Sequence, residues 1–149
     1  MKKPLLSTTT TTRIVGWVLA AAVGQPDAHA GEVPMAYVVL RDGTTVSAEA
    51  LREFAAGRVP ERAAVPVRIE IIPQMPMTAV GKIFKPRLRD LAIERVCRET
   101  LQAAGIEATI TVRADKRVGT VATIRLGDAA SRDAATDALA RLPIAIEFE

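Results

Sequence analysis

The sequence is poor in the side chains from which many enzyme sites are built. Its 149 residues include one cysteine and one histidine, and aromatic residues make up 3% of the chain. A single cysteine excludes an intrachain disulfide and a cysteine-rich zinc site. A single histidine disfavours a histidine-based metal cluster or a Ser-His-Asp triad, so we expect no metal site. So few aromatic residues also argue against a base-stacking surface, and we expect no nucleic-acid partner.

A hydrophobic run long enough to cross a membrane is also absent. Ile14–Val23 is apolar, but ten residues are too few to span a bilayer, and we expect no membrane partner. The basic pair Lys2-Lys3, this apolar run and Ala28-His29-Ala30 nevertheless follow the order of a signal peptide with its cleavage site. We expect a cytoplasmic protein, with export and cleavage after Ala30 as the alternative.

The rest of the composition is that of a folded protein. Hydrophobic residues make up 49% of the chain and charged residues 25%, which argues against wholesale disorder and provides for a modest core. Residues 1–13 are the exception, because they are polar, rich in threonine and without periodicity. We predict that this N-terminal segment is disordered.

Short strands and helices alternate along the remaining chain. Strands are predicted at 36–40, 67–71, 108–112, 118–126 and 144–148, and helices between Ser47 and Gly57, at 88–104 and at 128–142. The fold class is therefore α+β: a small mixed sheet with helices packed on it, followed by a second small β-β-α-β unit. We divide the chain into 14–90 and 91–149, with the two units meeting near residues 90–105.

Positive charge is concentrated in one short segment. Residues 66–90 carry five basic side chains and two acidic ones, whereas residues 91–149 carry slightly more acidic than basic ones. A compact basic segment suits a phosphorylated small molecule better than a nucleic-acid backbone, which usually meets a broader basic stripe.

The most informative residues lie within that segment, from Pro76 to Arg89. They do not form a Walker A loop, because Pro76 stands where glycine is required and Ile83 follows the lysine. Gly81 allows close approach of the backbone to a ligand, and Lys82 is a point charge on a long stem that reaches a phosphate or a developing oxyanion. The residues alone leave a solvent-exposed basic loop as the alternative.

The pattern P-x-T-x-x-G-K-I-x-K-x-x-L-R at 76–89 resembles the final core motif of the adenylate-forming superfamily, which includes the acyl-CoA synthetases. The preceding segment 22–34 is similar to the family's segment before that motif. The predicted strand at 36–40 and the helix after it are also similar to that part of the family. Together these features cover about residues 20–90 in the family's order. The hairpin around 115–117 is similar to a tail on some fatty acyl-CoA synthetases.

The resemblance implies roles for single residues. It implies that Lys82 is catalytic, closing over the active site and stabilising charge while a carboxylate attacks the α-phosphate of ATP. It further implies cofactor-binding positions at Gly81, Lys85 and Arg89, with ATP and CoA as cofactors and magnesium held by the family's N-terminal domain. Segment 25–32 is explained as a family loop, which argues against cleavage after Ala30.

The resemblance covers the family's C-terminal domain and not the large N-terminal domain that holds the adenine and acyl pockets. We therefore expect a detached or truncated C-terminal lid domain of an acyl-CoA synthetase, not catalytic alone and acting on a carboxylic acid or acyl-adenylate with an adenylation N-domain in trans. Two alternatives are a non-catalytic interaction module and a small exported protein with a chance motif match. We expect His29 to be structural or exposed and Cys97 to belong to the core.

Overall fold

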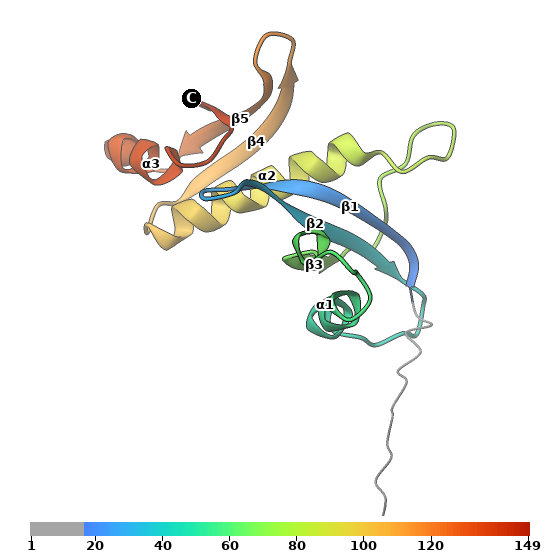
Figure 1. Ribbon diagram of the computed structural model, residues 1–149. Coiled ribbons are helices and arrows are strands. Elements are labelled where there is room, and N and C mark those ends of the chain that lie inside the picture. The colour runs from blue at the N-terminus through green and yellow to red at the C-terminus, as the bar shows by residue number, and fades with distance from the viewer. Residues whose placement is uncertain (1–16) are drawn as a thin grey trace, which may run out of the picture.

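The computed structural model describes residues 17–149. In this part of the chain, two three-stranded sheets lie on either side of one long helix, α2 (Lys85–Ala103), as Figure 1 shows. The predicted α+β class, a small mixed sheet followed by a β-β-α-β unit, is confirmed. The disorder predicted for residues 1–13 and the first residues of the apolar run at 14–23 lie outside the described residues.

The first sheet has the order β1-β2-β3 and is covered by a helix on each face. β1 (Trp17–Asp27) pairs antiparallel with β2 (Gly31–Leu40), and β3 (Arg68–Ile71) runs parallel to β2. Met35 and Tyr37 of β2 pack toward α2, whereas Ala36 and Val38 pack toward α1 (Ala48–Ala56). This alternation follows the two-residue period of a strand and produces a helix–sheet–helix sandwich.

The β1–β2 hairpin corrects the prediction of a loop at 25–32. Only Ala28–Ala30 form the turn, and the residues on both sides belong to the two strands. The Asp27 carboxylate accepts hydrogen bonds from the backbone amides of Ala30 at 2.8 Å and His29 at 2.9 Å, which lower its pKa. Gly31 then enters β2 with a positive φ of 79°. Cleavage after Ala30 would remove β1 and the buried side chains of Ala21 and Val23.

Helix α1 agrees closely with the sequence-based expectation. The Ser47 hydroxyl accepts a hydrogen bond from the Ala50 amide at 3.1 Å, as expected of an N-cap, and the helix ends at Gly57. A short 3-10 turn, η1 (Arg62–Ala64), leads to β3. The expected burial of alternate residues in β3 is wrong at both ends: Ile69 is buried, but Val67 and Ile71 are 51% and 37% exposed. β3 is a four-residue edge strand that is covered only at its centre.

Helix α2 is shared by two hydrophobic cores. It begins three residues before the predicted start, because Pro86 fits the first turn, where a backbone N–H has no helical partner. Leu88 and Ala92 pack against the first sheet, whereas Cys97 and Leu101 pack against the second. The prediction that Cys97 belongs to the core is confirmed. Burial raises the pKa of its thiol to about 12.

The second sheet has the order β4-β5-β6. β4 (Ala108–Asp115) and β5 (Gly119–Leu126) form a hairpin, and β6 (Ala145–Phe148) runs parallel to β5. β4 is longer than predicted because the Asp115 carboxylate closes the turn, accepting hydrogen bonds from the amides of Arg117 and Val118.

The helix predicted at 128–142 is shorter in the structure. A 3-10 turn, η2 (Ala129–Ser131), precedes α3 (Arg132–Leu139). Asp128 accepts a hydrogen bond from the Ala130 amide and so caps this tight turn. At the other end, Pro143 disfavours helical backbone at the residue before it. No helix between residues 17 and 149 is long and apolar enough to cross a bilayer.

Candidate functional site

Lys82 lies on a small hairpin between β3 and α2. Met77 and Ile83 form an antiparallel bridge at this hairpin. The Gly81 amide donates to the Thr78 carbonyl at 3.0 Å, and the Thr78 amide donates to the Lys82 carbonyl at 2.7 Å. Gly81 has a φ of 77°. A tight turn followed by a glycine in the left-handed region is the usual geometry of a three-residue hairpin loop.

This geometry assigns Thr78 and Gly81 a clear structural purpose. The Lys82 amide donates a hydrogen bond to the Thr78 hydroxyl at 3.1 Å, so the side chain of Thr78 fixes the backbone of the lysine. Gly81 supplies the left-handed conformation, for which a residue with a Cβ incurs steric strain. The two residues therefore present the Lys82 side chain on a defined backbone.

The hairpin has a buried base and an exposed tip. At its base, Met75 and Leu88 are buried in the core between the first sheet and α2, and Ile83 packs against them. At its tip, Val80 is 80% exposed. The Lys82 side chain is exposed, and it takes part in none of the ion pairs between residues 17 and 149. A free ammonium group on an anchored hairpin is well placed to meet an anion from outside this chain.

Lys85 and Arg89 line a groove that Lys82 does not line. Both line an open groove of about 490 Å³ beside β1 and β2, together with Gly24 and Glu32. Arg89 also lines a second groove, of about 510 Å³, between the two units. Neither Gly81 nor Lys82 lines either groove. The structure thus brings Lys85 and Arg89 together at one groove, and their grouping with Lys82 stays a prediction.

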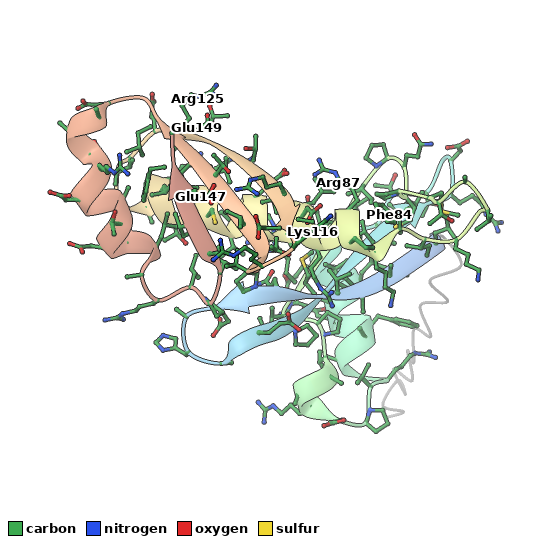
Figure 2. All side chains as sticks on the ribbon, turned by 90° about the horizontal axis from the view of Figure 1, so that it is seen from above. Phe84, Arg87, Lys116, Arg125, Glu147 and Glu149 are labelled. Atoms are coloured by element: carbon green, nitrogen blue, oxygen red, sulfur yellow. The ribbon has the colours of Figure 1, made fainter. Side chains whose placement is uncertain are left out.

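Arg87, between those two residues in sequence, lies differently. Its guanidinium donates to the Glu94 carboxylate at 3.1 Å, and it does not line either groove. Figure 2 shows Arg87 with Phe84 at the start of α2; Phe84 is 43% exposed. Arg87 is therefore a paired surface cation, in contrast to Lys85 and Arg89.

A polar cluster behind the hairpin was not found from the sequence. Arg95 of α2 donates to the Gln25 side-chain oxygen at 2.7 Å, and its Nε lies 3.3 Å from the Glu70 carboxylate. The neighbouring Tyr37 is 1% exposed, and burial, followed by the charge of Glu70, raises its pKa to about 12. These contacts join β1, β3 and α2, and so fix the helix from which the hairpin emerges.

The sequence does contain a signal for this cluster. Leu88, Ala92 and Arg95 lie three or four residues apart, so the arginine continues the buried stripe of the helix. A charged residue on such a stripe needs a partner. Glu70, flanked by apolar residues in β3, is the partner that this pattern could have suggested.

His29 lies where it was expected from the sequence. His29 is exposed in the turn between β1 and β2. Within the described residues, no three side chains of histidine, cysteine, aspartate or glutamate are grouped as they would be to hold a metal ion.

Comparison with known protein families finds one matching model. Residues 16–82 match the AMP-binding enzyme C-terminal domain. The match ends at Lys82, so it includes the first sheet, α1 and the first arm and tip of the hairpin described above.

Comparison with single proteins finds similar sequences and structures. Marinolic acid–CoA ligase from Pseudoalteromonas is 43% identical over 118 residues, which cover 78% of this chain and 18% of that protein. A putative acyl-CoA synthetase from Bacillus subtilis is 40% identical over 72 residues, covering 48% of this chain and 13% of the relative. A Mycobacterium tuberculosis fatty acyl CoA synthetase has a TM-score of 0.48 and 30% identity, covering 54% of this chain and 16% of that one.

Proposed function

The chain carries the C-terminal domain of the AMP-binding enzyme superfamily, and on this premise we propose that it forms the lid of an acid–CoA ligase. In the proposed reaction a carboxylate oxygen bonds to the α-phosphorus of ATP, the bond to the β-phosphate breaks, and pyrophosphate leaves. The thiol of CoA then attacks the acyl-adenylate and releases AMP. The support for this reaction is the similarity to relatives that are named as CoA ligases and synthetases.

Lys82 is the catalytic residue of the proposal. When the lid closes, its ammonium group meets the oxygens on which negative charge gathers as the carboxylate attacks phosphorus. Electrostatic stabilisation and positioning are what such a transfer mostly requires from a protein. Gly81 contributes by holding the hairpin in the conformation that presents this lysine.

The observation that carries the proposal is the state of Lys82. Exposed lysines without an acidic partner are common, and Lys116 is another, so the unpaired charge alone does not distinguish Lys82. What distinguishes Lys82 is that its backbone is held by the Thr78 hydroxyl, directly after the left-handed Gly81, while its side chain is exposed and outside every ion pair of the described residues. A lid lysine requires this combination of a fixed backbone and an unpaired ammonium group.

The proposed reaction also needs an adenylation domain. This chain spans 18% of the Pseudoalteromonas relative and 13% of the Bacillus one. We propose that ATP, magnesium and the carboxylic acid are bound mainly by such a domain, supplied in trans or within a longer polypeptide. We also propose a cytoplasmic location without cleavage after Ala30, supported by the place of residues 17–27 in the first sheet.

An ATP–pyrophosphate exchange assay tests this function. The chain is joined to the adenylation domain of the Pseudoalteromonas ligase in place of that enzyme's own matching segment, and exchange is measured with that enzyme's acid. Lys82→Ala is expected to lower exchange roughly 100-fold or more, the usual cost of losing one charge-stabilising group. Lys116→Ala is the matched control, because Lys116 is an exposed lysine on the β4–β5 hairpin and lies outside the matched residues 16–82, and we expect little change.

Equal exchange in the Lys82→Ala and wild-type hybrids would contradict the lid function. A hybrid that folds and binds the adenylation domain but shows no exchange at all would favour the second candidate, a non-catalytic interaction module. The exposed apolar side chains of Met77, Val80 and Phe84 are the observation behind that candidate. The third alternative, a chance motif match, is wrong, because the family model covers residues 16–82 as a whole.

A further inference from the structure

Two grooves meet at Arg89. Gly24, Glu32 and Arg89 line both the groove of about 490 Å³ beside β1 and the groove of about 510 Å³ between the two units, and we call the two together the joined groove. Each part alone has the volume of a typical small-molecule site. The walls come from the first sheet, from α2 and from the second sheet, so residues on both sides of α2 shape this joined groove.

One end of the joined groove is basic. Lys85 and Arg89 lie one helical turn apart on the first turns of α2, where the helix dipole also favours an anion. Among residues 17–149, no ion pair involves either of them. Two unpaired cations facing one groove are a suitable site for a phosphate group.

Glu32 is the acidic residue that lines the joined groove, and the position of its side chain depends on Gly24. A Cβ on Gly24 would lie 2.0 Å from Cδ of Glu32, so the absence of a side chain at Gly24 leaves the space in which the Glu32 side chain lies across β1. The Glu32 carboxylate therefore borders both parts of the groove. Its negative charge opposes an anion at its own position in the groove, whereas it accepts hydrogen bonds from neutral donors.

The other end of the joined groove is mainly apolar. Ile93 of α2 lines it together with Val118 and Ile144, which belong to the second unit. Thr120 adds one hydroxyl group. Val118 is 61% exposed, so an apolar ligand would cover a hydrophobic side chain that otherwise faces water.

We propose that the joined groove binds a phosphate monoester with a short, mainly apolar chain. Its phosphate lies at Lys85 and Arg89, and its chain lies along Ile93, Val118 and Ile144. The second unit thereby has a function, which is to supply one wall of this site. The site does not depend on Lys82 or on the ligase reaction, so it can be tested on the chain alone.

Titration calorimetry of the full chain tests the proposal, with hexyl phosphate and inorganic phosphate as probes. We expect saturable binding of hexyl phosphate, and binding of inorganic phosphate at least about fivefold weaker because it lacks the apolar chain. Arg89→Ala is expected to weaken hexyl phosphate roughly tenfold. Arg87→Ala is the matched control, since Arg87 is on the same helix but is paired with Glu94 and lies outside the groove; we expect no change.

A second variant tests the wall from the second unit. Val118→Ser is expected to weaken hexyl phosphate about threefold and to leave inorganic phosphate unchanged, because it removes apolar contact and no charge. Both Arg89 and Val118 are exposed, so neither substitution threatens folding. Equal affinities for the two probes would mean adventitious anion binding only. The proposal would be overturned by equal affinities for the two probes or by the absence of saturable binding. It would also be overturned if Arg87→Ala weakened the binding of hexyl phosphate as much as Arg89→Ala does.

Discussion

At the scale of single residues, Gly81 shows how a local conformation prepares the site. The sequence suggested that this glycine allows a ligand to approach the backbone. The structure provides a different reason, which is that Gly81 adopts a φ of 77° directly before Lys82. No heavy atom lies within 4 Å of the place of a Cβ, so a side chain would have space and the constraint is conformational.

Gly81→Ala is therefore expected to destabilise the hairpin by about 1–2 kcal/mol, the cost of a left-handed conformation with a Cβ. The Lys82 amide, now held by Thr78, should exchange its hydrogen faster, while the melting temperature changes little because the hairpin tip lies outside the cores. Gly57→Ala is a suitable control, because Gly57 has a φ of −78° that alanine also adopts. Unchanged exchange at Lys82 in the Gly81 variant would contradict this reading.

Ionisation of Tyr37 is expected to lower the stability of the fold at alkaline pH. Burial raises the pKa of its hydroxyl from 10.0 to about 12, so the folded state holds this proton more tightly than the unfolded state does. Stability from this group is complete below pH 10 and is lost as the pH rises from about 10 to 12. The buried Cys97 thiol also lowers the stability of the folded state as the pH rises above 9, because burial raises its pKa to about 12.

We expect the free energy of unfolding to fall between pH 9 and 11, and to fall less in Tyr37→Phe, which has no hydroxyl to ionise. At pH 7 the two proteins should differ by only about 1 kcal/mol. Urea unfolding at a series of pH values measures both effects. Parallel losses of stability in the wild type and in Tyr37→Phe would show that Tyr37 does not titrate as described.

At the scale of elements, α2 connects the two parts of the chain. Leu88 is fully buried against the first sheet, and Leu101 is 1% exposed against the second. The proposed division at residue 90 falls within this helix. Since the helix cannot lose one core without exposing part of its apolar surface, we expect the two units to unfold together.

Substitutions at the two ends of α2 test this coupling. Leu88→Ala and Leu101→Ala should each cost about 3 kcal/mol, as is usual for a buried leucine. Each should lower one common calorimetric transition, although the leucines belong to different cores. Two separate transitions in either variant, with only the substituted side unfolding early, would show that the units are independent.

The elements also show what could be predicted from sequence. The N-cap at Ser47, the apolar stripe of α2 and the α+β class follow from local patterns, and the structure agrees. The β1–β2 hairpin was missed because Gln25–Asp27 contains proline and polar residues, and its strand conformation depends on pairing with residues distant in sequence. Asp128 caps a helical segment as predicted, but that segment begins with the 3-10 turn η2, and the end of β4 depends on the Asp115 carboxylate; a periodicity argument locates neither of these boundaries.

The candidate site, too, could be predicted only in part from the sequence. The motif identified Lys82 and Gly81, but it also grouped Lys85 and Arg89 with them. The family resemblance implied that grouping, and the structure adds that Lys85 and Arg89 line a groove beside β1 that neither Gly81 nor Lys82 lines. The contact between Arg95 and Glu70 joins a helix and an edge strand, and it was recognised only from the fold.

At the scale of the whole molecule, the described part of the chain consists of two small sheets packed on one shared helix. The hairpin with Lys82 and the joined groove use different surfaces of this body. If the body moves as a lid, both surfaces move together, because α2 belongs to both cores. The central claim remains that Lys82 acts in adenylate formation.

The most direct test of that claim measures the two half-reactions separately in the hybrid with the Pseudoalteromonas adenylation domain. If Lys82 stabilises the charge formed at the α-phosphate, Lys82→Ala should slow acyl-adenylate formation roughly 100-fold or more. Thioester formation from added acyl-adenylate and CoA should stay close to the rate of the Lys116→Ala control. Equal slowing of both half-reactions, or normal adenylate formation without Lys82, would contradict the account.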